Sequence, residues 1–191
     1  MKSLYINTTG RNLNLGFKDG DDFRFFESDG ILSQSEEIFP AIMKILGQNK
    51  ISDLDFIVCL GGPGSFTGIR LGLSIVKGFN IAVGVPVITL NNFMASFYSI
   101  KDKVNEFYIA LSSGVAELFV SKFSSNGKVL EEGKLVKKDS FQPLEKVYFD
   151  TQIDTKAVLF QVEKNFDKKS FKQGGIEPTY IKPHYAKVKA K

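Results

Sequence analysis

Residues 61–72 read Gly61-Gly62-Pro63-Gly64-Ser65-Phe66-Thr67-Gly68-Ile69-Arg70-Leu71-Gly72, and this stretch decides the fold of the 191-residue chain. It follows a continuous apolar segment, residues 56–60, and leads into a second apolar segment with helical spacing. A strand, a glycine-rich turn and a helix in this order bring backbone N–H groups close to a phosphate or to another backbone. The first case predicts a nucleotide-binding enzyme, and the second predicts a scaffold.

Two nucleotide-binding motifs resemble this run, and both fail at chemically important positions. A Walker loop needs four residues between its glycines and then a lysine, whereas Gly64 and Gly68 enclose three residues and no lysine follows. A dinucleotide-binding turn needs a third glycine where Thr67 stands. It also needs a carboxylate about 20 residues later, where residues 83–86 are all apolar, Gly or Pro. We therefore do not expect this loop alone to bind a nucleotide.

The helix predicted after the loop has an apolar arc that is broader than one sheet face can cover. At 100° per residue its apolar side comprises Gly68, Ile69, Leu71, Gly72, Leu73, Ile75, Val76, Phe79, Ala82 and Val83. Gly68 and Gly72 lie near the middle of this arc, and each glycine costs a helix interior about 1 kcal/mol relative to alanine. Two explanations remain open: close approach of another helix, or tight packing of this helix on its own sheet.

A second helix with a broad apolar arc is predicted upstream, from a capping box at residues 33–36 to about Leu46, with Gly47 at its end. Its apolar side chains form two adjacent stripes: Ile38, Ile42 and Ile45, then Phe39, Met43 and Leu46. Two such helices in one small domain predict an intermolecular helical contact. The predicted interface consists of Phe39, Met43, Leu46, Gly68, Ile69, Gly72, Leu73 and Val76. Replacing Met43 and Leu73 by lysine is expected to abolish assembly and leave the fold intact.

The composition excludes several classes of catalytic site. The single cysteine, Cys59, lies in an apolar segment and is interpreted as a core residue, and one cysteine excludes an internal disulfide. One cysteine and one histidine, His184, cannot build a zinc site or a credible Ser-His-Asp site. We find neither a run of 18 apolar residues nor a signal-type start, which predicts a soluble, cytoplasmic protein without membrane contact.

The positive charge of the chain is concentrated near its C-terminal end. Residues 156–191 carry a net charge of +6, whereas the remainder carries −2. Such a lysine-rich segment is typical of a solvated surface, and contact with nucleic-acid phosphates is the alternative interpretation.

The order of the predicted elements indicates two lobes. A strand at residues 4–6, a hairpin at 12–18 and 21–27, and helix-linked strands at 56–60 and 86–90 predict a ribonuclease-H-like lobe over residues 1–97. Residues 98–191 read as a reduced second copy. Its predicted strands are 107–111, 116–123, 128–134 and 146–149, followed by a short helix at 157–165.

Several motifs together resemble the TsaB (YeaZ) family. They are residues 61–72 with Lys77-Gly78 and Pro86 after them, the opening residues 4–9, Ser35-Glu36 with Phe39-Pro40, and the closing residues 178–182. The similarity is strong over residues 1–97 and thin from 98 to 175. It implies an α/β, actin-like ATPase (ribonuclease-H-like) fold with two lobes, the second reduced.

The resemblance also implies a function. Members of this family are non-catalytic subunits that form a heterodimer with TsaD, the catalytic subunit, and recruit the ATPase TsaE for threonylcarbamoylation of tRNA. The equivalent helices form that contact, and homodimers through the same surface are also expected. No cofactor of its own is expected, and ATP or ADP at the interface with the partner is the alternative.

The chain departs from the actin-like pattern where catalysis would need charge. Asn7 stands at the position of the Asp that organises Mg²⁺ in such ATPases, so no ATP turnover is expected. Mg²⁺-dependent hydrolysis that is lost in Asn7→Ala would contradict this. In the second lobe, Ser112, Ser113 and Gly114 replace an Asp-Ala-Arg run of the family. Ser65, Thr67 and the helix N–H groups are candidates for a shared anion site. Arg70 is a further candidate, with a salt bridge on the polar helix face as its alternative role.

Three classes of function therefore remain. The preferred one is a non-catalytic subunit of the tRNA-modifying complex. The others are a free-standing homodimeric binding module and an actin-like ATPase or metalloprotease.

Overall fold

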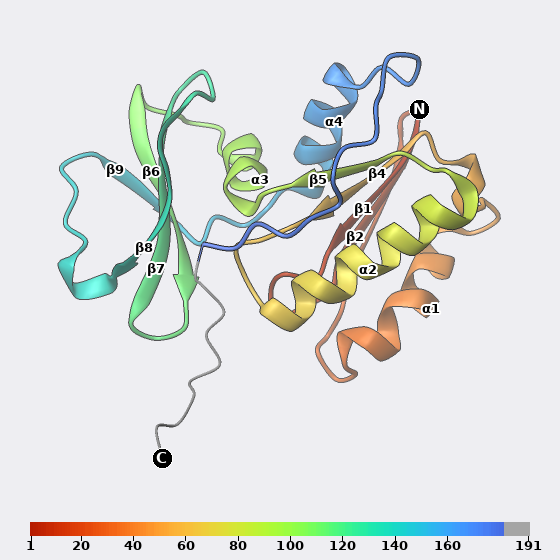
Figure 1. The fold of residues 1–191 in the computed structure, drawn as a ribbon, viewed down its shortest axis with the longest axis horizontal. Helices are drawn as coiled ribbons and strands as arrows, with labels where there is room; N and C mark the ends of the chain where they lie inside the picture. Colours follow the sequence, from red (N-terminus) through yellow and green to blue (C-terminus); the bar gives the residue numbers. More distant parts are fainter. Residues whose placement is uncertain (182–191) are drawn as a thin grey trace.

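The computed structural model describes residues 1–181, which form two β-sheets with four α-helices packed on and between them (Figure 1). His184 and the last four lysines of the predicted basic segment lie outside the described residues.

The first sheet has the strand order β3-β2-β1-β4-β5. Its strands are β1 (Lys2–Asn7), β2 (Asn14–Asp19), β3 (Asp22–Glu27), β4 (Phe56–Leu60) and β5 (Val87–Leu90). The first three strands pair antiparallel, and β1–β4 and β4–β5 pair parallel. The parallel connections run through α1 (Gln34–Leu46) and α2 (Phe66–Val83), as a parallel crossover requires. This order confirms the predicted ribonuclease-H-like sheet.

The second sheet repeats the order of the first four strands, as β8-β7-β6-β9. Its strands are β6 (Glu106–Ser113), β7 (Glu117–Ser124), β8 (Val129–Lys137) and β9 (Lys146–Phe149), with β6 and β9 parallel. A single 3₁₀ turn, η2 (Lys138–Ser140), takes the place of a crossover helix between β8 and β9. The repeated order without a fifth strand confirms an actin-like fold whose second lobe is reduced.

The two faces of the first sheet bury different side chains. Leu4 and Ile6 of β1 belong to the core beneath α1 and α2, whereas Tyr5 belongs to a core beneath α4 (Thr155–Asn165). This alternation follows from the two-residue period of a strand. Helices α1 and α2 therefore cover one face of the sheet, and α4 covers the opposite face (Figure 1).

Helix α3 (Asn92–Ser99) connects the lobes and is not among the elements that the sequence predicts. The predicted boundary at 97/98 falls inside α3, and α4 returns to the first sheet, so the division into 1–97 and 98–191 stays a prediction. Within residues 1–181, α2 is the one helix that is long and apolar enough to cross a membrane by length and composition. Six of its 18 residues are buried in the domain.

Candidate functional site

The glycines of α2 lie against the backbone of this chain. A Cβ added to Gly68 would meet the carbonyl oxygen of Thr8 at 1.8 Å, and one added to Gly72 would meet Thr8 Oγ1 at 2.5 Å. The Thr8 hydroxyl in turn donates a hydrogen bond of 2.6 Å to the Gly68 carbonyl. The prediction that these two glycines face a partner helix is therefore wrong. They allow α2 to lie on the turn that follows β1, which is the second explanation that the sequence left open.

Most other residues of the predicted interface are also covered by this chain. Leu46, Ile69, Leu73 and Val76 are buried in the core between the helices and the first sheet. Phe39 and Met43 differ, because 52% and 62% of these residues remain exposed. The proposed double lysine variant needs correction, since a lysine at Leu73 would place a charge in the core.

An apolar patch does remain on the outer side of the two helices. Phe39 of α1 contacts Phe79 of α2 edge to face, with ring centres 6.2 Å apart. Met43 and Val83 lie one helical turn beyond these rings, and both are exposed. We call Phe39, Met43, Phe79 and Val83 the α1–α2 patch. Phe79 and Val83 are not in the interface predicted from the sequence, although both belong to the apolar arc.

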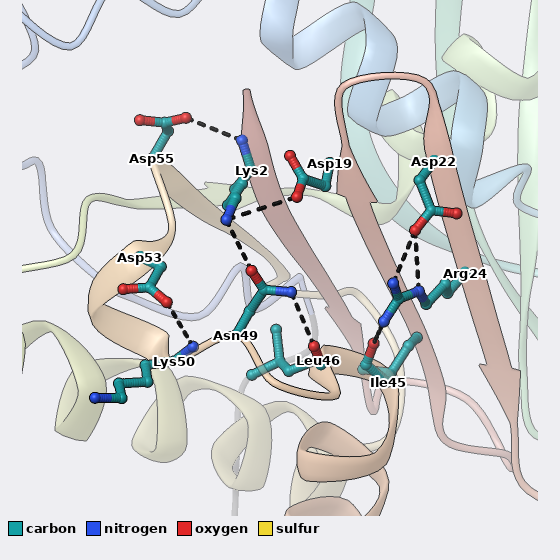
Figure 2. A network of polar contacts seen from close by, with 10 residues as sticks. All are labelled: Lys2, Asp19, Asp22, Arg24, Ile45, Leu46, Asn49, Lys50, Asp53 and Asp55. Atoms are coloured by element: carbon teal, nitrogen blue, oxygen red, sulfur yellow. Dashed lines mark hydrogen bonds and ion pairs between the residues drawn. The ribbon is translucent and has the colours of Figure 1, made fainter.

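The C-terminal end of α1 is anchored to the first sheet by polar contacts (Figure 2). Arg24 of β3 donates to the Ile45 carbonyl at 3.3 Å, and its guanidinium is held by Asp22. Lys2 of β1 donates to the side chain of Asn49, which donates to the Leu46 carbonyl. These bonds satisfy helix-end carbonyls that lack intrahelical partners. They fix the orientation of the α1–α2 patch relative to the sheet.

The N-terminal end of α1 confirms the predicted capping box. The Glu36 carboxylate accepts hydrogen bonds from the Ser33 hydroxyl and from the Ser33 N–H. These two bonds lower the pKa of Glu36 below its ordinary value.

A cleft of about 670 Å³ separates the lobes. Its lining comes from the turn after β1, the glycine loop, the β6–β7 turn and the last described residues: Thr9, Gly10, Arg11, Pro63, Gly64, Ser65, Phe66, Ile69, Ser112, Ser113, Gly114, Phe119, Thr179, Tyr180 and Ile181. None of these lining residues is an aspartate or a glutamate.

Asn7 has a structural partner in this region. Its side-chain oxygen accepts from the N–H of Thr9 at 2.9 Å and from the Thr9 hydroxyl at 2.7 Å. Asn92 of α3 donates to the same hydroxyl and to the Pro63 carbonyl. The turn after β1, the glycine loop and α3 are thus tied together. The turn after β1 does not fit a Mg²⁺–nucleotide in the actin-like manner, because Asn7 stands there in place of a carboxylate and its amide oxygen is engaged by Thr9.

The candidate anion-site residues are only partly brought together. Ser65 caps α2, its hydroxyl accepts from the Gly68 N–H, and its own N–H donates to the Thr9 carbonyl. Thr67 is exposed and does not line the cleft. The Arg70 guanidinium lies 3.7 Å from the ring centre of Phe66 and contacts the Tyr180 hydroxyl. Within residues 1–181 Arg70 forms no salt bridge, so its predicted alternative role is not observed among the described residues.

Sequence reasoning missed an acidic group in the second lobe. Asp150, directly after β9, accepts from the Ser112 N–H at 2.7 Å and from the Ser112 hydroxyl at 2.5 Å. Its φ of 39° is unusual for a residue with a side chain. A carboxylate therefore does lie beside Ser112, but it comes from a strand 38 residues away.

Comparisons with known proteins agree with this architecture. A family model described as TsaD, tRNA N6-adenosine threonylcarbamoyltransferase, matches residues 33–177. The TsaB protein of Buchnera aphidicola subsp. Schizaphis graminum is 26% identical over 102 residues, which is 51% of this chain and 49% of that protein. The tRNA N6-adenosine threonylcarbamoyltransferase of Borrelia garinii subsp. bavariensis is 24% identical over 144 residues, 72% of this chain and 43% of that protein. The matches thus span about half or less of these curated relatives.

The solved structure of YeaZ from Pseudomonas aeruginosa superimposes with a TM-score of 0.71 at 12% identity, covering 94% of this chain and 99% of that one. At this identity the likeness establishes the fold alone. The family model covers more than half of the chain, and several of the matching sequences are TsaB proteins. The chain therefore belongs to the family that this threonylcarbamoyltransferase model describes, and within it to the TsaB (YeaZ) proteins.

Proposed function

We propose that this protein is the non-catalytic scaffold subunit of the complex that forms N6-threonylcarbamoyladenosine in tRNA. In this proposal the chain binds the catalytic TsaD subunit through the α1–α2 patch and supports its active site. The observation that carries the proposal is the patch itself. Phe39 and Met43 stay more than half exposed, although α1, which bears both, is capped at its N-terminal end and tied to β3 at its C-terminal end.

The other residues of the predicted interface are buried, and their burial also supports a preformed apolar surface on the outer side of α1 and α2. Their packing on the sheet holds α1 and α2 rigid, and the outer side chains are presented without further rearrangement. A preorganised apolar surface loses little conformational entropy when a partner binds. Aromatic and methionine side chains are enriched in protein–protein interfaces.

The residues of the cleft support a non-catalytic role. A chain without a carboxylate at the end of β1 lacks the group that organises Mg²⁺, and Asn7 serves the local turn instead. We accordingly propose that the protein has no cofactor of its own, and that any ATP or ADP lies at the junction with TsaD. Recruitment of TsaE, contact with tRNA through the complex, and cytoplasmic localisation belong to the same proposal.

The test is co-purification with tagged TsaD from the same cell. The variant is Phe39→Lys with Met43→Lys, and the matched control is Val115→Lys with Leu144→Lys, which adds equal charge at exposed apolar sites outside the patch. We expect the patch variant to lose TsaD and the control to retain it. Thermal unfolding of both variants checks that their folds are intact.

Three outcomes would contradict the proposal. Retention of TsaD by the folded patch variant would exclude the α1–α2 patch as the interface. Failure of the unmodified protein to bind TsaD, with a dimer seen by light scattering, would favour the free-standing homodimeric module. Mg²⁺-dependent ATP hydrolysis by the isolated protein would favour the enzyme alternative.

A further inference from the structure

We propose that the outer face of α4 binds single-stranded RNA. Lys156, Phe160 and Lys164 follow one another at four-residue intervals, so they form a ridge along one side of this helix. Phe160 is 49% exposed, whereas the neighbouring Val158 and Leu159 are fully buried in the core. The inner side chains of α4 therefore hold the helix on the sheet, and the ridge is not needed for that packing.

A hollow of about 440 Å³ lies between this ridge and the β2–β3 hairpin. Phe23 of β3 and the turn residues Gly20 and Asp21 form its opposite wall. The Lys164 ammonium is 4.5 Å from the ring centre of Phe160, and the Lys156 ammonium is 5.9 Å from that of Phe23. The hollow thus combines two aromatic rings with a lysine ammonium over each ring, and rings with nearby cations are the combination that binds stacked bases and backbone phosphates.

The charges around the hollow favour an anionic occupant. Lys18 and Glu163 form an ion pair of 2.7 Å and largely neutralise each other. Lys156 and Lys164 have no carboxylate partner among residues 1–181, and Asp21 is the remaining acid of the lining. An unpaired lysine near the first turn of a helix opposes the helix dipole, so Lys156 does not serve the stability of α4.

The position of the ridge is compatible with a partner on the other side of the sheet. Helix α4 covers the face opposite to α1 and α2 (Figure 1), so TsaD bound at the α1–α2 patch would leave the ridge open. The inference rests on the proposed function in one respect: the proposed function identifies the RNA as tRNA. The RNA contact itself rests on the ridge and the hollow.

The test uses the full chain and a labelled, unstructured RNA of about 16 nucleotides, the upper site size of one single-strand-binding module, in fluorescence anisotropy. Phe160→Ala is expected to weaken binding about 5-fold or more, because it removes a stacking surface. Lys156→Ala with Lys164→Ala is expected to lower the slope of log affinity against log salt by about 1.4, since each single-strand phosphate contact contributes about 0.7.

Matched controls keep the test specific. Phe149→Ala removes an exposed ring from β9, and Lys137→Ala with Lys138→Ala removes equal charge from the second lobe. Both controls should retain the affinity and the salt slope. Thermal unfolding of Phe160→Ala establishes that it is folded.

Three results would overturn the inference. The first is that the unmodified chain does not bind the RNA at low salt. The second is that binding is lost only when the four lysines of residues 182–191 are replaced by serine. The third is that the ridge variants weaken binding to anionic vesicles but not to RNA. Co-purification with TsaD is scored separately. If TsaD binding fails while the ridge behaves as expected, the proposed function falls and the RNA surface stands.

Discussion

Gly68→Ala tests whether the glycines of α2 exist for packing on this chain. The added Cβ would lie 1.8 Å from the Thr8 carbonyl oxygen, so α2 or the turn must move. Overpacking of this kind costs about 1–3 kcal/mol, and loss of the Thr8–Gly68 hydrogen bond costs about 1 kcal/mol more. The higher helix propensity of alanine offsets about 1 kcal/mol. We expect a net loss of about 2 kcal/mol in the free energy of unfolding.

The same helix supplies a control of opposite sign. A Cβ at Gly78 meets nothing within 4 Å, so Gly78→Ala is expected to gain about 1 kcal/mol from propensity alone. For a domain of this size, 1 kcal/mol shifts the melting temperature by about 2–4 °C. Thermal unfolding should therefore show a decrease of about 4–8 °C for Gly68→Ala and an increase of about 2–4 °C for Gly78→Ala. If Gly68→Ala is as stable as Gly78→Ala and instead loses TsaD, then Gly68 faces a partner and our interpretation is wrong.

Three further predictions concern the core and the two ends of α1. Burial raises the pKa of Cys59 to about 12, so a thiol reagent at pH 8 should not label the folded protein and should label it fully in denaturant. Arg24→Ala removes the hydrogen bond to the Ile45 carbonyl; it should cost about 1 kcal/mol in urea unfolding and weaken TsaD retention. Hydrogen bonds from Ser33 lower the pKa of Glu36. Its stabilising contribution is therefore present above the ordinary glutamate pKa of 4.5 and is lost as the pH falls through the lower folded value. Ser33→Ala should consequently show a smaller loss of melting temperature between pH 7 and pH 3 than the unmodified protein.

Local patterns in the sequence were sufficient for most of the fold. The strands at 56–60 and 146–149 agree with β4 and β9 at both ends, and the hairpin turn at Asp19-Gly20 lies where it was expected. These elements have strong local signals: runs rich in β-branched and aromatic residues, and an Asp-Gly pair at the hairpin turn. Helix α3 has an asparagine cap, Asn91, but only eight residues, and its Phe93 and Phe97 pack into the second-lobe core, so its periodicity was too short to predict it.

The interface residues could be predicted only in part, for a physical reason. An amphipathic arc shows that side chains avoid water, and it does not show which surface covers them. In this protein the sheet covers Leu73 and Val76, and the carbonyl of Thr8, 60 residues before Gly68, covers the glycines. The carboxylate beside Ser112 was missed for the same reason, since Asp150 reaches it through the pairing of β6 with β9.

The contacts of the glycine loop tie the start of α2 to the turn after β1 and to the last described residues. In an actin-like cleft the turn after β1 and the N-terminus of the following helix present polar groups to phosphates. Here the Ser65 N–H donates to the Thr9 carbonyl, and the Gly61 carbonyl accepts from the Thr179 N–H. The Ser65 N–H, a donor that an anion could otherwise use, is therefore satisfied by a backbone carbonyl of this chain. Because this bond also fixes the start of α2, it contributes to the rigid presentation of the α1–α2 patch that the proposed scaffold role requires.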